Sequence, residues 1–123
     1  MYKRILVGTD GSPTAQIAVD RAAEVARQLE APLTVLTAMR KATGDQLLAK
    51  ERARLEPTGV DLTTKVVEKD PATALIDEVE QGGYDLLVVG NKGMTGVGRF
   101  FLGSVPNKVS HHVPCSLLIV RTT

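Results

Sequence analysis

The stretch that decides the fold is DLLVVGNKGMTGVGRFFLGS, residues Asp85 to Ser104. It starts with Asp85 and the apolar run Leu86 to Val89, which together predict a buried strand. It continues into Gly90 to Ser104, which holds five glycines in fifteen positions. Glycine in a loop costs conformational entropy, so a local need should compensate for it. The pattern indicates a tight turn, or backbone N–H groups that must come close to a ligand.

The rest of the chain alternates predicted strands and helices around this stretch. Strands are predicted at Ile5 to Val7, Leu33 to Ala38, Leu62 to Glu68, Asp85 to Val89 and Cys115 to Val120. Helices are predicted from Ser12-Pro13, over Asp45 to Glu56, from Asp70-Pro71 to about Glu80, and over Ser104 to His112. Strands that are apolar on consecutive residues are covered on both faces, as in parallel sheets. We therefore expect an α/β chain with a three-layer, doubly wound, five-stranded parallel sheet, formed by residues 1–123 as a single domain.

Two unusual loops follow predicted strands, and in such folds ligands bind beyond the carboxyl ends of the strands. They are Gly8-Thr9-Asp10-Gly11 and the segment from Gly90 onward. If the first and fourth strands are neighbours, both loops converge on one crevice. Gly103-Ser104 stands at the start of a predicted helix, whose free N–H groups favour a phosphate. The sequence thus predicts an anion cradle for a phosphorylated small molecule; the alternative is that these glycines only shape a surface loop.

Composition restricts the classes of function. The chain has 15 basic and 14 acidic residues, a net charge of +1, and 3% aromatic residues. Nucleic-acid binders usually have a basic excess or aromatic stacking platforms, so we expect no nucleic-acid partner. No apolar run approaches the ~20 residues that span a bilayer, and we expect no membrane insertion. One cysteine and no signal-peptide core fit a cytoplasmic protein.

Three residue types outside the glycine segment have competing interpretations. Asp10 is favoured as a ligand contact over a turn or capping role, because it should face the glycine loop. His111 and His112 are expected in the last turn of a helix, where cationic side chains suit the helix dipole, and no metal site is expected. Cys115 is expected to be packed rather than nucleophilic.

Over nearly its whole length the chain resembles the universal stress protein family. The resemblance is carried by ILVGTDGS near the start, DLLVVGNKGMTGVGRFFLGSVPNKV, and PCSLLIV at the last strand. The spacing Gly-x-x-Gly, nine residues, Gly-Ser is similar to that family's ATP-binding signature. The resemblance implies an adenine nucleotide alpha hydrolase-like fold with strand order 3-2-1-4-5, ATP with a divalent ion such as Mg²⁺ or Mn²⁺, and a homodimer joined through the last strand, Cys115 to Val120.

The resemblance also implies a set of cofactor-binding positions. Asp10 matches an acidic residue near the ribose, Gly8 and Thr9 match pocket-lining positions, and Ala38 matches the position whose backbone meets adenine. The pocket floor and phosphate contacts are matched by Val89, Gly90, Gly93, Gly103, Ser104 and Val105, and Asn91 and Lys92 fill the variable pair between the first two glycines.

One departure from the family pattern is the stretch from Met39 to Asp61, which is shorter than usual. In the family this stretch lies beside the part of the pocket that receives adenine. Because it is short here, we expect that part of the pocket to be more open.

These observations favour a dimeric, ATP-binding module of the stress response whose occupancy is sensed by a protein partner of unknown identity. Three alternatives stay open: a slow ATP hydrolase or nucleotidyl transferase, a member that binds AMP or cyclic AMP, and a dimerisation module with an empty pocket. No general base is identifiable, so a binding role is favoured over an enzyme, although positioning and Mg²⁺ alone can support phosphoryl transfer.

Overall fold

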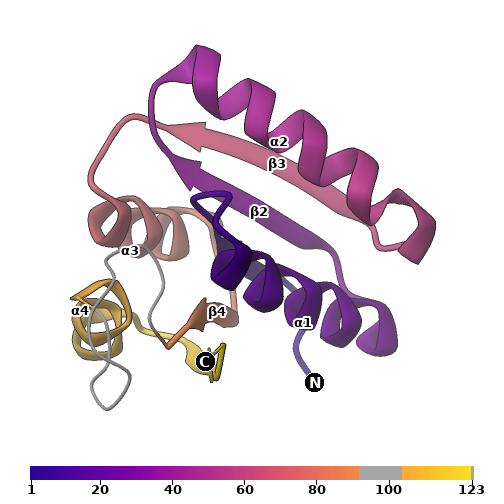
Figure 1. Cartoon of the computed structure of the whole chain (residues 1–123). Coiled ribbons are helices and arrows are strands. Elements are labelled where there is room, and N and C mark those ends of the chain that lie inside the picture. Colours follow the sequence, from indigo (N-terminus) through magenta and orange to yellow (C-terminus); the bar gives the residue numbers. More distant parts are fainter. Residues whose placement is uncertain (92–103, 123) are drawn as a thin grey trace.

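The computed structural model describes residues 1–91 and 104–122 (Figure 1). Within these residues, parallel strands alternate with helices. The strands are β1 (Ile5–Gly8), β2 (Leu33–Ala38), β3 (Leu62–Val67), β4 (Leu86–Gly90) and β5 (Ser116–Val120). The helices are α1 (Pro13–Leu29), α2 (Lys41–Leu55), the short 3₁₀ helix η1 (Glu56–Thr58), α3 (Pro71–Gly82) and α4 (Ser104–His112).

The strands form one five-stranded sheet in the order β3-β2-β1-β4-β5, with every neighbouring pair parallel. This confirms the predicted doubly wound α/β fold and its strand order. No helix in residues 1–91 or 104–122 has the length and apolar character that crossing a bilayer requires.

Alternating strand side chains enter two separate cores, one on each face of the sheet. Ile5 and Val7 pack with the small residues of α1 and with Leu48 of α2. Leu6 enters the opposite core, which α3 and α4 complete (Figure 1). Both faces of β1 are therefore covered, which explains why this strand is apolar on consecutive residues.

Two helix starts follow the sequence signals on which they were predicted. At α1, Ser12 Oγ accepts a hydrogen bond from the N–H of Ala15 at 3.2 Å, and Pro13 is the first helical residue. At α3, Asp70 Oδ2 accepts from the N–H of Thr73 at 3.1 Å. Hydrogen bonds from the hydroxyl and the N–H of Thr73 lower the pKa of the Asp70 carboxyl.

The second helix starts at Lys41, earlier than the predicted Asp45. The prediction was wrong because the usual start signals are missing: Arg40 occupies the cap position without a side-chain cap, and Gly44 lies in the second turn. Tertiary contact outweighs the low helix propensity of glycine here. The other predicted ends agree with the structure within about two residues.

Gly44 is buried because α2 approaches β3 closely at this position. A Cβ added to Gly44 would lie 2.6 Å from Val66 Cγ1, 3.0 Å from Val66 Cγ2 and 3.2 Å from Met39 Cγ. Val66 is branched at Cβ and lies on a strand, so its methyl groups have little room to move. The missing side chain of Gly44 thus sets the distance between helix and sheet.

We predict that Gly44→Ala destabilises the protein by about 1–3 kcal/mol, although alanine is normally the better helix residue. Thr43→Ala, at an exposed position of the same helix, is the matched control and should leave the midpoint of chemical unfolding nearly unchanged. Adding Val66→Ala to Gly44→Ala should recover part of the loss. A Gly44→Ala protein as stable as the control would disprove the close contact.

Candidate functional site

The first loop is held between β1 and β2 by its own backbone. Thr9 is fully buried. Its N–H donates to Leu36 O at 2.9 Å, and its carbonyl oxygen accepts from Thr37 Oγ1 at 2.7 Å. The loop therefore leaves the sheet in a fixed direction at the carboxyl end of β1.

Asp10 is half-buried in this loop, and its carboxylate stabilises the loop backbone. Its Oδ1 accepts a hydrogen bond from the N–H of Ser12 at 2.9 Å, and one residue earlier Thr9 Oγ1 accepts from the N–H of Gly11 at 3.0 Å. Asp10 therefore stabilises the turn, which is one of the two roles predicted for it. A ligand contact through this carboxylate stays a prediction.

Gly11 has a conformation that favours glycine, and a neighbouring side chain approaches it closely. Its φ of +82° lies in the left-handed region that glycine favours. A Cβ on Gly11 would lie 2.7 Å from Cδ1 of Leu47, a half-buried residue of α2. The early part of α2 thus lies against the loop that follows β1, a contact that the sequence pattern did not indicate.

A narrow apolar cleft opens between the ends of β1 and β4. Val89 and Gly90 end β4, and both are buried. On the other side of the cleft, Val105 and Pro106 belong to the first turn of α4 and are also buried. The described residues that line the cleft are Gly8, Ala15, Leu75, Val89, Gly90, Val105 and Pro106. Four predicted site residues are therefore brought together: Gly8, Val89, Gly90 and Val105.

The remaining predicted site residues are distributed around or beyond this cleft. Ser104 is exposed and is the first residue of α4. Ala38 ends β2 and is half-buried, outside the residues that line the cleft. Lys92, Gly93 and Gly103 lie outside the described residues.

Asn91 follows Gly90, but its side-chain oxygen is hydrogen-bonded to Thr122, which follows β5. Asn91 Oδ1 accepts from both the N–H and the hydroxyl of Thr122, at 2.8 and 2.9 Å. No sequence signal indicated this arrangement, because Thr122 is distant in the chain and lies beyond the last predicted strand.

The two histidines and the cysteine occupy ordinary structural positions. His111 and His112 are exposed in the last turn of α4. Residues 1–91 and 104–122 contain no group of three or more His, Cys, Asp or Glu side chains that could hold a metal ion. Burial raises the pKa of the Cys115 thiol, which lowers its thiolate fraction and fits a packed residue rather than a nucleophile.

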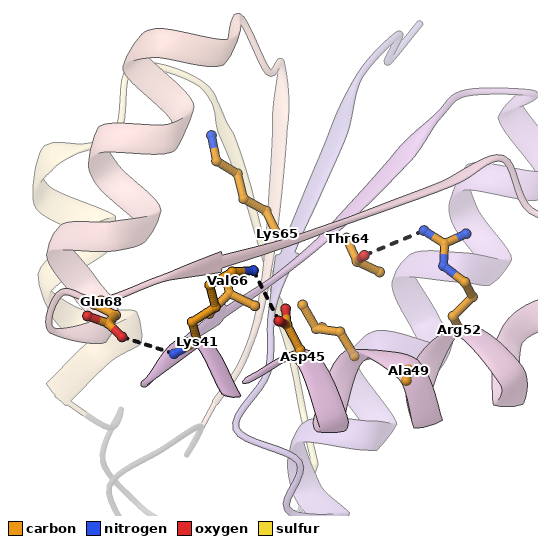
Figure 2. A pocket seen from close by; sticks show the side chains of 9 residues that line it. Lys41, Asp45, Ala49, Arg52, Thr64, Lys65, Val66 and Glu68 are labelled. Carbon is orange, nitrogen blue, oxygen red and sulfur yellow. Dashed lines mark hydrogen bonds and ion pairs between the residues drawn. The ribbon is translucent and has the colours of Figure 1, made fainter. Parts of the chain in front are cut away.

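A larger hollow of about 750 Å³ lies elsewhere, between α2 and the edge strand β3 (Figure 2). Several of its polar side chains have hydrogen-bond partners. Asp45 lies 3.0 Å from Lys41 Nζ, Glu68 accepts from the Lys41 N–H at 2.9 Å, and Arg52 reaches Thr64 Oγ1 at 3.5 Å. We nevertheless place the candidate site at the smaller cleft, of about 10 Å³ within the described part of the chain, because it lies where the strand order reverses and where the glycine-bearing strand ends meet.

Comparisons with known proteins agree with this fold. A family model described as "Universal stress protein family" matches residues 1–48 and 37–121. The chain belongs to the universal stress protein family. A universal stress protein of Mycobacterium tuberculosis, Rv1636, is 34% identical over 145 residues, which cover 99% of this chain and 98% of the relative.

Solved universal stress proteins have the same architecture. One in complex with cAMP is 36% identical, with a TM-score of 0.87 over 99% of this chain and 98% of that chain. A universal stress protein from Archaeoglobus fulgidus in complex with dAMP, at 20% identity, supports the fold alone, with a TM-score of 0.78 over 98% of both chains. The alignment to the mycobacterial relative is longer than the 123 residues of this chain, and the family match is split near residues 37–48. Both observations fit a short connection after β2, while the more open adenine end stays a prediction.

We predict that Gly11→Ala costs more stability than Gly59→Ala. Gly59 has a similar φ of +74° but nothing within 4 Å of an added Cβ, so it measures only the cost of the backbone conformation, about 1–2 kcal/mol. Gly11→Ala should lose about 0.5–1.5 kcal/mol more, because the new methyl group forces the terminal methyl of Leu47 to move. Chemical unfolding of both variants tests this; equal losses would disprove the prediction.

Proposed function

We propose that this protein binds an adenine nucleotide, ATP in the first instance, in the cleft between β1 and β4. The observation that carries the proposal is the convergence of Gly8 and Gly90, at the carboxyl ends of adjacent parallel strands, with the first turn of α4. A glycine at each strand end lets a ligand approach the backbone, and a helix N-terminus attracts phosphate.

The ligand is assigned by chemistry that these residues fit. Ser104 places a hydroxyl at the start of α4, and the positive end of the helix dipole favours an anionic group there. The apolar surface of Val89 and Val105 suits the uncharged part of a nucleotide. Asp10, Ala38, Asn91, Lys92, Gly93 and Gly103 remain proposed contacts from the family resemblance. Mg²⁺ or Mn²⁺ would be held chiefly by the nucleotide phosphates, because Asp10 alone is a weak site.

The solved relative in complex with cAMP favours cyclic AMP as a second ligand to be compared with ATP. Calorimetric titration with ATP, AMP and cyclic AMP, each with and without Mg²⁺, should give saturable binding for at least one. No binding of any adenine nucleotide would disprove the proposed function. A parallel assay of phosphate release separates binding from hydrolysis.

We predict that Gly8→Val weakens nucleotide binding by about tenfold or more, because its branched side chain would enter the cleft. Asp10→Ala should also weaken binding, but it additionally removes the acceptor for the Ser12 N–H. Asp10→Asn keeps that acceptor and removes only the charge, so it isolates the ligand contact from the loop. Gly59→Ala, distant in sequence and directly after η1, serves as the control.

Dimerisation through β5 is the second part of the proposal. β5 is an edge strand, and its Leu117, Leu118 and Ile119 are half-buried apolar residues. The opposite edge, β3, carries exposed Thr63 and Lys65. Charged or polar edge residues discourage pairing between chains, whereas an apolar edge invites it. We therefore propose that two copies pair along β5, and that a partner protein recognises the nucleotide-bound dimer.

The β4–β5 ladder identifies a substitution that tests this pairing without breaking the sheet. Val120 faces β4, since its carbonyl oxygen accepts from the Asn91 N–H at 2.8 Å. Alternate residues of a parallel strand direct their backbone groups to opposite sides, so Ile119 points its N–H outward and Leu118 points its N–H to β4.

We predict that Ile119→Pro yields a folded monomer, because proline removes only the outward N–H. Leu118→Pro should instead destabilise the fold, since it removes a ladder hydrogen bond. Sedimentation of both variants against the unmodified protein measures the oligomeric state. A dimer that survives Ile119→Pro unchanged would exclude pairing along β5.

A further inference from the structure

Asn91 joins the residue that ends β4 to the residues that follow β5. Its N–H donates to Val120 O at 2.8 Å, which continues the β4–β5 pairing by one step. Its Oδ1 accepts from the N–H of Thr122 at 2.8 Å and from the Thr122 hydroxyl at 2.9 Å. Both backbone and side chain of one residue therefore hold the chain where it leaves β5.

The position of Asn91 places this connection between two proposed functional surfaces. Its neighbour Gly90 lines the cleft, and its partner Val120 ends the edge strand that we propose as the dimer interface. Asn91 and Thr122 are both half-buried, so their hydrogen bonds are partly protected from water. A change in the direction in which the chain leaves Gly90 must alter these bonds, and a displacement of the β5 end must act on Gly90 in return.

We propose that Asn91 is a positioning residue that couples occupancy of the cleft to pairing along β5. The proposal rests on the proposed nucleotide binding and dimerisation, and it assigns Asn91 a role in addition to the ligand contact that the resemblance implied. Coupling between two binding events is reciprocal. We take the coupling to be favourable, so that nucleotide tightens the dimer by the same factor by which dimerisation tightens nucleotide binding.

The chemistry of the contact provides a conservative variant. Thr122 donates twice to one oxygen, so any side chain with an acceptor at the Asn91 Oδ1 position preserves the contact. Asn91→Asp keeps an acceptor, and Asn91→Ala removes it. Thr122→Ala removes the hydroxyl and keeps the backbone donor, from a position that does not line the cleft.

The first experiment needs no nucleotide. We expect Asn91→Ala to raise the dimer dissociation constant by about threefold to tenfold and to speed amide hydrogen exchange at Thr122. Asn91→Asp should restore both quantities toward those of the unmodified protein. Thr63→Ala, at an exposed threonine on the other edge of the sheet, is the matched control for Thr122→Ala. An unchanged dimer dissociation constant in Asn91→Ala overturns the proposal.

The second experiment measures the coupling directly. The dimer dissociation constant is determined with and without saturating ATP or cyclic AMP for the unmodified protein, Asn91→Ala and Thr122→Ala. In the unmodified protein, nucleotide should lower the dimer dissociation constant. The ratio of the constants without and with nucleotide should be smaller in Thr122→Ala and smaller still in Asn91→Ala. Equal ratios in all three proteins overturn the coupling although nucleotide binds. Absence of nucleotide binding disproves the proposed function, whereas the nucleotide-free experiment still decides the role of Asn91 at β5.

Discussion

The pairing of β1 between β2 and β4 is the constraint on which the rest of the structure depends. Val7 lies opposite Val35 on one side and opposite Val88 on the other. The chain moves outward from β1 to β2 and β3, then returns to β4, so the strand order reverses beside β1. At that reversal the connections from β1 and β4 leave toward opposite faces of the sheet, and a cleft forms between them.

The two ends of the sheet are stabilised in different ways. Near the amino ends, Tyr84 Oη lies 3.0 Å from both Thr34 Oγ1 and Glu78 Oε2, and Lys65 Nζ lies 2.6 Å from Glu78 Oε1. Burial raises the pKa of Tyr84, which keeps its hydroxyl protonated as a donor. At the carboxyl ends, the cleft is instead lined by glycine and small or apolar side chains. Side-chain hydrogen bonds occur at both ends, since Thr37 and Asn91 make them beside the carboxyl ends, but only the carboxyl ends present glycine backbone at a cleft.

Local signals predicted most of this architecture because each depends on neighbouring residues only. The apolar run at Ile5 to Val7, the caps at Ser12 and Asp70 and the apolar run before Gly90 each indicated the element that the structure contains. Family resemblance supplied the strand order. The one wrong helix start has no local signal: Arg40 makes no side-chain cap at the start of α2, and Gly44, a poor helix former, is packed against Val66.

The candidate site was predicted less completely than the fold for the same reason. The glycine pattern pointed to the loops after β1 and β4, and the family resemblance supplied Gly8, Val89, Gly90 and Val105, which line the cleft. It did not reveal that Leu47 rests on Gly11, or that Thr122 takes up the side-chain oxygen of Asn91. Both contacts join residues that no short-range pattern relates. The two edges of the sheet also differ, since β3 exposes Thr63 and Lys65 whereas the half-buried residues of β5 are all apolar. If two copies pair along β5 as proposed, each covers the apolar edge of the other. The strands left at the outside then carry Thr63 and Lys65, which disfavours the addition of further strands and the growth of a fibre.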